Sequence, residues 1–325
     1  MPPKIWSKRS GSKPTEEMIK VLFCDYFREW MEAYKAGTVA TATLQKYRMT
    51  HIRLSELAPD LSMESIDRRS YQRLINSYAI THERQTTLDF HRQLKACLTD
   101  ARDDGTISCD PTRKVVIKGK MPRHKKMKYL SADELRRLLD MLPLAPDKSD
   151  FDWLILLLAK TGLRYAEALA LTPNDFDFSA PKISITKTWN YKFEPYGFAP
   201  TKNTSSVRDV TIDDVLASQF KCLVKDLQPD KPIFIDPDAR VFNSTINGVL
   251  ARYCKAAGVP VISAHGLRHT HASVLIAAGV SVQTVSKRLG HSNTTTTQNT
   301  YLHIIRELEA KDRDKTMGCL SSLCG

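Results

Sequence analysis

The chain has 325 residues, of which 42% are hydrophobic and 26% are charged, and its net charge is +12. This is a globular composition with material for about two domains. No run of about 18 apolar residues occurs and the basic start MPPKIWSKRSGSKP has no apolar stretch, so we expect neither a membrane span nor a secretory signal. The seven cysteines are scattered and form no CxxC pair, which favours a reduced, cytoplasmic protein.

The positive charge is unevenly distributed along the chain. Residues 1–130 hold 25 of the 48 basic and 15 of the 36 acidic side chains, so this part carries +10 and the remainder +2. Such an excess indicates a polyanionic partner, although a basic run is also typical of a solvated linker. Eight basic residues and no acidic residue fall within residues 113–128: Arg113, Lys114, Lys118, Lys120, Arg123, Lys125, Lys126 and Lys128.

The first part of the chain predicts a helical domain after a flexible basic arm at residues 1–14. Apolar residues recur at helical spacing over 15–112, in four segments that begin near residues 18, 41, 67 and 85. Four helices with short connections indicate a small bundle, in which the aromatic stripe is core rather than a platform for stacking bases. Residues 113–130 follow as a basic interdomain linker.

A second domain is predicted over 131–315, followed by a C-terminal tail at 316–325. Ser131 and Glu134 form a capping-box pattern before an apolar run. Alternating segments at 182–189 and 206–212 predict strands of a small antiparallel sheet. The helices are expected at about 151–160, from 163, and at 213–226, 244–257, 266–278, 281–289 and 294–314.

Four short stretches of this domain carry the polar side chains of a candidate site. Each is ambiguous alone: Arg164 and Glu167 have the spacing of an ion pair on one helix face. His265 and His269 have the spacing of two zinc ligands, but no further ligand completes such a site, so we expect no metal and no other cofactor. The stretches are Thr161–Glu167, Thr201–Asn203, His265–His269, and Leu289–His291 with Tyr301 ten residues later.

The combination of these groups suits strand transfer on a phosphodiester backbone. Guanidinium groups give bidentate, charge-assisted hydrogen bonds to phosphate oxygens and stay protonated. A positioned lysine can protonate a leaving oxygen, and tyrosine is an admissible covalent nucleophile. Two arginines, two histidines, a lysine and a tyrosine therefore supply these roles without a metal ion.

These motifs resemble those of the tyrosine recombinase, or phage integrase, family. The segments concerned are TGLRYAEALAL, TKNTSSVRDV, HGLRHTHASVL and LGHSNTTTTQNTY. The resemblance extends strongly over 131–315 and more weakly over 15–120. It implies a mainly α fold with a small antiparallel β-sheet, in which a helical core-site DNA-binding domain precedes an α+β catalytic domain.

The resemblance also implies the chemistry. Tyr301 attacks the DNA backbone to give a 3′-phosphotyrosyl intermediate, while Arg164 and Arg268 hold the scissile phosphate. Lys202, in the hairpin turn, is the general acid toward the 5′-oxygen, with Lys187 as the alternative. The bond energy is kept, so a free 5′-hydroxyl of a partner strand can reverse the attack without ATP.

Three further side chains support these groups in the same resemblance. His265 and His291 bind the phosphate or assist proton transfer to and from Tyr301. Glu167 orients the first arginine or a neighbouring histidine. The implied partners are double-stranded recombination sites, a homotetramer assembled on DNA, an excisionase and a host DNA-bending protein, in a bacterial or phage-infected cell.

The resemblance carries further expectations about assembly. The two domains would hold opposite faces of a duplex, with residues 113–128 crossing its backbone, and the segment after Tyr301 would dock on a neighbouring subunit. Many family members carry an additional N-terminal arm-binding domain; the residues before the first helix are too few for one, so that domain is either lacking or precedes this sequence.

Several functions fit the sequence. A mobile-element integrase is favoured over a chromosome- or plasmid-dimer resolvase of the same family. A type IB topoisomerase also combines a tyrosine with two arginines, but it would relax supercoils without a partner site. A non-catalytic DNA-binding regulator would need the basic stretch and the helical domain but no nucleophile.

Overall fold

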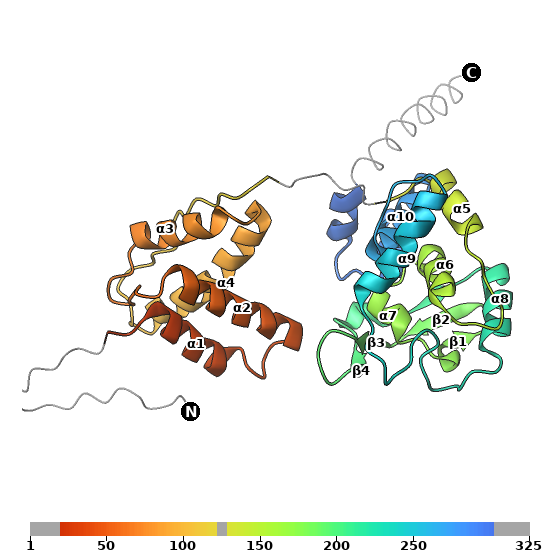
Figure 1. The fold of residues 1–325 in the computed structure, drawn as a ribbon, viewed down its shortest axis with the longest axis horizontal. Helices are drawn as coiled ribbons and strands as arrows, with labels where there is room; N and C mark the ends of the chain where they lie inside the picture. Colours follow the sequence, from red (N-terminus) through yellow and green to blue (C-terminus); the bar gives the residue numbers. More distant parts are fainter. Residues whose placement is uncertain (1–19, 122–128, 302–325) are drawn as a thin grey trace, which may run out of the picture. The chain divides into compact units, whose positions relative to one another are not determined.

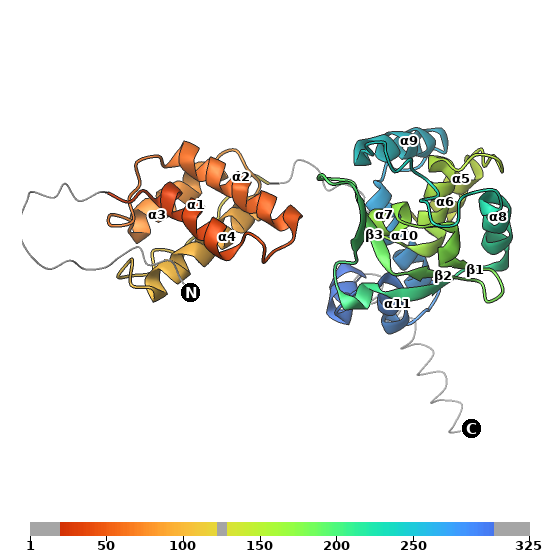
Figure 2. The same ribbon diagram turned by 90° about the horizontal axis from the view of Figure 1, so that it is seen from below.

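The computed structural model describes residues 20–121 and 129–301, and its chain divides into two compact units, residues 1–125 and 126–325. Figures 1 and 2 show the first unit as a group of helices and the second as helices around short strands. The fold class is therefore the predicted one, mainly α with a small antiparallel sheet. Over the described ranges, every helix is too short or too polar to cross a membrane. The predicted arm and C-terminal tail lie outside these ranges.

The helical unit is built around the aromatic stripe of its first helix. Phe23, Phe27 and Trp30 are almost fully buried, and Trp30 Nε1 donates a hydrogen bond to Asp100 Oδ2 over 2.7 Å, which joins the first helix to the fourth. The stripe is thus core, because one face of an amphipathic helix must be covered. The helices are α1 (Phe23–Tyr34), α2 (Thr41–Leu57), α3 (Arg68–Ala79) and α4 (Arg84–Asp103).

The first half of the basic stretch differs from the expected linker. Residues 113–121 lie along the helical unit, where the side-chain amide of Gln72 both donates to the carbonyl of Val116 and accepts from its N–H, each over 2.9 Å. Val115 and Ile117 pack against the core, and Lys120 forms an isolated bridge with Glu83. The apolar residues between the lysines fix this segment. Four of the predicted DNA-binding residues lie outside the described ranges: Arg123, Lys125, Lys126 and Lys128.

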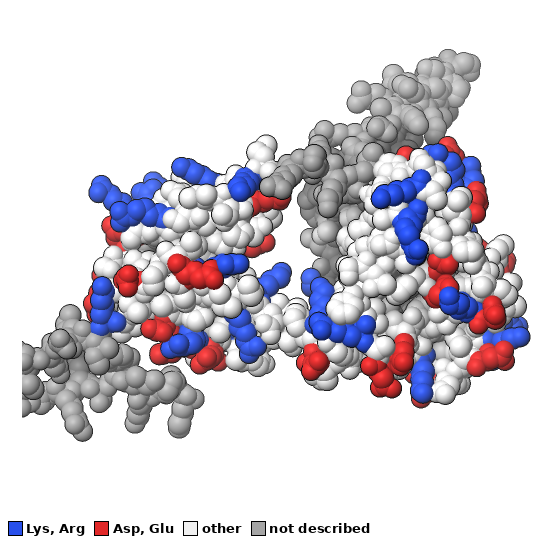
Figure 3. Space-filling view, viewed as in Figure 1, with Lys and Arg blue, Asp and Glu red and all other residues white. Residues whose placement is uncertain are grey.

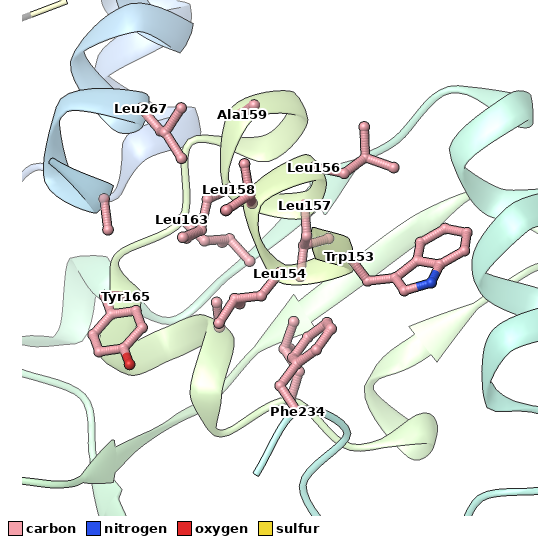
Figure 4. Packing of buried hydrophobic residues seen from close by; sticks show 14 of the residues in the cluster. Trp153, Leu154, Leu156, Leu157, Leu158, Ala159, Leu163, Tyr165, Phe234 and Leu267 are labelled. Atoms are coloured by element: carbon pink, nitrogen blue, oxygen red, sulfur yellow. The ribbon is translucent and has the colours of Figure 1, made fainter. Parts of the chain in front are cut away.

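The second unit is centred on α6, whose residues are buried on nearly every side. Figure 4 shows Leu267 of α10 facing Leu158 and Leu163 in this core. The capping box at Ser131 is present, since its Oγ accepts from the N–H of Glu134 and its own N–H is bound by the glutamate. The helices are α5 (Ala132–Asp140), α6 (Phe151–Thr161), α7 (Tyr165–Leu169), α8 (Asp214–Val224), α9 (Asn243–Ala256), α10 (Ala264–Ala277) and α11 (Val282–Leu289).

The strands form a longer and more interrupted hairpin than predicted. A three-stranded antiparallel sheet has the order β1-β2-β5, and β3 pairs with β4 in a second, two-stranded sheet. The connection predicted between two strands therefore contains a strand of its own, with residues 191–196 at the tip. The strands are β1 (Phe176–Asp177), β2 (Lys182–Ile185), β3 (Lys187–Asn190), β4 (Gly197–Pro200) and β5 (Arg208–Thr211).

Candidate active site

Arg164 lies between α6 and α7, just after the left-handed residue Gly162 that ends α6. Its Nη1 donates to Oε1 of Glu167 over 2.6 Å and to Oγ of Ser206 over 3.2 Å, and its Nη2 donates to the carbonyl of Gly290 over 2.9 Å. These bonds use three of the five N–H donors of a guanidinium, so donors remain for an anion. The side chain is 28% exposed, which leaves it accessible from solvent.

Glu167 connects Arg164 to a second arginine, Arg208 at the start of β5. Arg208 Nη2 donates to Oε2 of Glu167 over 3.0 Å, and the backbone N–H of Arg164 donates to the same oxygen over 2.9 Å. Burial alone would raise the pKa of Glu167, but the charge and hydrogen bonds of Arg208, together with Arg164, hold it below its ordinary value. The carboxylate is therefore ionised and fixes both guanidiniums in place.

Arg268 is the second predicted phosphate-binding arginine, and α10 buries it to 3% exposure. Its Nη1 donates to the carbonyl of Gly162 over 2.8 Å and its Nη2 to that of Leu289 over 2.7 Å. Burial, followed by the charge of Arg164, lowers the pKa of Arg268 to about 9. Arg268 remains charged at neutral pH, and an anion bound beside the two arginines would relieve their repulsion.

The two predicted histidines flank these arginines. His265 is exposed on the first turn of α10, and loss of surrounding water, followed by the charges of Arg268 and Arg164, lowers its pKa. His291 follows α11 and forms a 2.7 Å hydrogen bond between Nδ1 and Oγ1 of Thr297. Burial and the same two arginines lower the pKa of His291 to about 4. Both rings are therefore neutral at pH 7.

Tyr301 ends the described part of a helical segment at 294–301. Its side chain is 2% exposed and belongs to a small apolar cluster with Ala272, Ile276 and Leu289, among others. Its hydroxyl forms a 2.9 Å hydrogen bond with Nδ1 of His269. Burial raises the pKa of Tyr301 to about 12, although the charge of Arg268 opposes this rise.

Lys202 lies farther along the hairpin than expected. It is exposed in the connection between β4 and β5 and not in the turn at the hairpin tip, so that part of the prediction is wrong. The next residue, Asn203, accepts a 2.5 Å hydrogen bond from Ser206, which in turn binds Arg164. Lys202 is thus the neighbour, in sequence, of a residue that is connected to Arg164 through one hydroxyl group.

The alternative lysine, Lys187, is engaged elsewhere. Its Nζ donates to both carboxylate oxygens of Asp175 over 2.6 Å, and the Asp175 side chain is only 10% exposed. A lysine held in this way is structural, because breaking the pair would leave a buried charge without its partner. Of the two predicted lysines, Lys202 is therefore the exposed one, and Lys187 is bound in an ion pair.

The sequence did not predict a part in the site for two residues, Arg208 and His269. Arg208 stands in the quoted segment TKNTSSVRDV without a role, and His269 was considered only as a zinc ligand with His265. The rings of His265 and His269 stand edge to face with centroids 4.9 Å apart. Within residues 20–121 and 129–301, no group of three or more His, Cys, Asp or Glu side chains is placed to share a metal ion.

Helices around a short antiparallel sheet, with a buried tyrosine hydrogen-bonded to a histidine and close enough to Arg268 to feel its charge, are typical of the tyrosine recombinases. The sequence profile of the phage integrase family matches residues 128–307, more than half of the chain, and the chain belongs to this family. It is a tyrosine site-specific recombinase.

Relatives support this family over longer stretches. A XerC-like tyrosine recombinase of Caldanaerobacter subterraneus subsp. tengcongensis is 26% identical and covers 86% of this chain and 79% of its own length. A putative prophage phiRv2 integrase of Mycobacterium tuberculosis is 25% identical over 98% of this chain and 82% of its own. The ICEBs1 integrase of Bacillus subtilis is 25% identical over 64% of this chain and 57% of its own.

Solved structures share the fold. The Tn1549 transposon integrase in complex with a circular intermediate DNA superposes with a TM-score of 0.72 at 20% identity, covering 90% of this chain and 99% of that one. A lambda integrase dimer bound to a COC′ core site gives a TM-score of 0.63 at 16% identity, covering 86% of this chain and 77% of that one.

Proposed function

We propose that this recombinase integrates and excises a mobile DNA element by cleaving and rejoining DNA through a 3′-phosphotyrosyl bond at Tyr301. The observation that carries the proposal is the cluster in which Arg164 and Arg208 both bind the carboxylate of Glu167, with the buried Arg268 acting electrostatically on Arg164 and on the Tyr301 hydroxyl. Such a cluster provides charge-assisted donors for the oxygens of a phosphodiester.

In the proposed reaction, the Tyr301 oxygen attacks phosphorus and the 5′-oxygen of the adjoining nucleotide leaves. Arg164 and Arg268 bind the non-bridging oxygens, whose charge grows in the phosphorane transition state. Lys202 protonates the departing 5′-oxygen, and its exposed position in the β4–β5 connection allows it to approach bound DNA. Attack of a 5′-hydroxyl from a partner strand on the phosphotyrosine reverses these steps and joins the strands.

The neutral histidines suit the phosphate as hydrogen-bond donors. If Nδ1 of His291 accepts the hydroxyl hydrogen of Thr297, its Nε2 carries the proton and can donate to a phosphate oxygen. His265, exposed one turn before His269 on α10, is placed to make the same kind of contact from solvent. Both remain uncharged until DNA binds, so they add donors without adding to the repulsion between the arginines.

The helical unit offers a separate surface for the DNA backbone. A groove of about 690 Å³ lies between α3 and the docked basic segment, and Figure 3 shows Lys and Arg side chains gathered there. Its one acidic lining residue, Asp67, caps α3 through Ser70. We assign this groove to phosphate contacts, which position a protein on DNA without reading its sequence. The basic side chains that line it are Arg68, Arg69, Lys114 and Lys118.

The relatives support the choice of a mobile element, since the phiRv2 and ICEBs1 proteins are named as integrases. The Tn1549 and lambda proteins were solved with DNA bound, the latter as a dimer. Exchange between two duplexes requires four cleavages, and we therefore propose a tetramer assembled on DNA in the cytoplasm. The XerC-like relative favours a second candidate function, the resolution of chromosome or plasmid dimers.

The proposal is tested by covalent capture. A pool of nicked duplexes with a randomised centre is incubated with the full chain, because loss of the short strand past the nick traps the phosphotyrosine. Wild-type protein should retain DNA in denaturing gels, and the Tyr301→Phe variant should retain none. A retained band with Tyr301→Phe would place the nucleophile elsewhere, and no band with the wild type would favour a regulator.

The captured duplexes then separate the two candidate functions. Plasmids carrying two copies of the recovered sequence are incubated with the purified protein and no other protein. A resolvase converts a dimeric plasmid into monomers at identical sites, whereas an integrase joins two dissimilar sites. Relaxation of a supercoiled plasmid that lacks these sites, at the rate seen with them, would instead indicate a topoisomerase.

A further inference from the structure

The hydroxyl of Tyr301 is held by a histidine that the motif-based assignment did not use. The Oη of Tyr301 and Nδ1 of His269 are 2.9 Å apart, and their ring centroids are 6.1 Å apart. Nδ1 of His291 is hydrogen-bonded to Thr297, and His265 lies at the exposed face of α10. Of the three histidines, His269 is the one within hydrogen-bond distance of the nucleophile.

We propose, on the basis of the proposed function, that His269 is the catalytic base that accepts the phenolic proton of Tyr301 during attack on DNA. The proton moves from Oη to Nδ1 as the bond from Oη to phosphorus forms. The bond from phosphorus to the 5′-oxygen breaks, and that oxygen takes its proton from Lys202. In the reverse reaction the imidazolium of His269 returns the proton to Oη.

The burial of Tyr301 explains why a base is required. A phenol with a pKa of about 12 is ionised in roughly one molecule in 10⁵ at pH 7. Tyr301 is 2% exposed, so hydroxide from solvent has little access to its hydroxyl. The imidazole already in contact with Oη takes up the proton without water, and the charge of Arg268 stabilises the phenolate that results.

Geometry separates the tasks of the two histidines on α10. His265 and His269 are one turn apart on the helix, and their rings are nearly perpendicular at 88°. His269 is half-buried against Tyr301, whereas His265 is exposed. His269, the half-buried ring, therefore acts on the nucleophile, and His265, the exposed ring, acts on the phosphate. Within the described residues, the titratable and charged groups that act on the pair include Arg268 and His265 of α10 and His291 after α11.

The first test uses His269→Asn, because an asparagine amide reaches the position of Nδ1 and keeps the hydrogen bond but cannot accept a proton. On the nicked duplexes captured by the wild type, we expect the rate of covalent complex formation to fall about 10²- to 10⁴-fold. The variant's rate should increase with pH between 7 and about 9, because without the base it follows the ionised fraction of Tyr301, whose pKa is about 12. A rate close to that of the wild type would show that His269 only positions Tyr301.

The second test asks whether His269 acts on the nucleophile or on the leaving group. In a duplex with sulfur in place of the bridging 5′-oxygen, the leaving group needs no proton. Lys202→Ala should then recover its rate, and His269→Asn should not. Equal recovery of both variants would overturn the proposal, because it would place His269 on the leaving-group side.

The third test separates loss of the base from misfolding of the variant. His269→Ala leaves a half-buried space, so added imidazole should restore covalent complex formation while pyrazole, of the same size but weakly basic, should not. Restoration by both would indicate a packing role and refute the base. Tyr301→Phe is measured in parallel: a covalent band with this variant refutes the proposed nucleophile itself, whatever the His269 variants do.

Discussion

Thr297 and Tyr301 lie one turn apart on the same helical segment, and each bonds a different histidine: Thr297 Oγ1 to Nδ1 of His291 over 2.7 Å, and Tyr301 Oη to Nδ1 of His269 over 2.9 Å. Residues four apart share a helix face. The segment that carries the nucleophile is thus aligned by two polar contacts on its buried side.

Replacing Thr297 by valine keeps the shape of this buried side chain and removes its hydroxyl. Nδ1 of His291 loses its partner, and the ring is free to adopt the other tautomer. We expect covalent complex formation on captured duplexes to slow by about 10-fold, since a small misplacement in a reacting site is costly. Thr300→Ala, on the exposed side of the same segment, is the control and should keep the wild-type rate.

The pair of Arg208 and Glu167 predicts strong coupling between two buried charges. Arg208→Met leaves the carboxylate, 1% exposed, with Arg164 alone, and we expect a loss of about 3–5 kcal/mol in the free energy of unfolding. Adding Glu167→Gln to Arg208→Met should return part of this loss, because no unpaired charge then stays buried. Calorimetry of the full chain measures both variants, and strictly additive effects would contradict the coupling.

His271 predicts how stability depends on pH. Its Nδ1–H donates to the carbonyl of Ala159, and its Nε2 accepts from Nε of Arg288 over 2.9 Å, so a second proton would face a guanidinium. Burial, followed by the charge of Arg288, lowers the pKa of His271 to about 4, whereas an unfolded histidine titrates near about 6.5. The unfolded chain therefore binds more protons between these values.

The contribution of His271 to the free energy of unfolding is therefore complete above about pH 6.5 and is lost as the pH falls toward 4. The loss amounts to as much as roughly 3 kcal/mol. His291, whose pKa is lowered in the same direction, adds to the loss. Thermal unfolding from pH 7.5 to 4.5 should show a smaller decrease in Tm for His271→Gln than for the wild type. Parallel curves for the two proteins would rule this histidine out.

Gly162 predicts a steric effect. Its φ is +68°, and a Cβ there would lie 2.6 Å from Cδ2 of His271 and 2.9 Å from Leu289. We expect Gly162→Ala to cost about 2–4 kcal/mol, from the left-handed backbone and from overpacking. Gly279 has a φ of +88° with open space around it, so Gly279→Ala should cost only about 1 kcal/mol. Equal changes in Tm would show that the close approach is relieved elsewhere.

The groove on the helical unit predicts a salt effect. Arg69→Gln and Lys114→Gln should each reduce the slope of log affinity against log salt by about 0.9, if each side chain neutralises one phosphate. Binding of the captured duplexes to the full chain, followed at several salt concentrations, gives these slopes. Arg136→Gln, which removes an exposed arginine of α5 paired with Asp133, should leave the slope unchanged.

Much of the fold was predictable because its signals are local. Helix periodicity marks α1 to α4 closely, and Ser131 and Glu134 mark the start of α5 by their own side chains. The segment 113–121 was misread because its charges suggested a solvated linker. The apolar run Val115–Ile117 between lysines is the signal that could have shown a docked segment, since Val115 and Ile117 pack against the core.

The candidate site was predictable in its membership and not in its contacts. The motifs name Arg164, Arg268 and Tyr301, but His265 and His269 stand four residues apart on one helix, and spacing alone does not show which ring meets the tyrosine. That choice depends on how the chain turns at Gly290, where Arg164 and Arg208 gather around the backbone. It is a property of tertiary packing, which no local pattern encodes.

The carboxylate of Glu167 among the arginines has an electrostatic consequence. Arg164, Arg208 and Arg268 carry three positive charges and Glu167 carries one negative charge, so these four side chains have a net charge of +2. An intact phosphodiester brings one negative charge and leaves the cluster positive, whereas a pentacoordinate phosphorane brings two. These arginines therefore attract the transition state more strongly than the bound phosphodiester, and that difference accelerates a reaction.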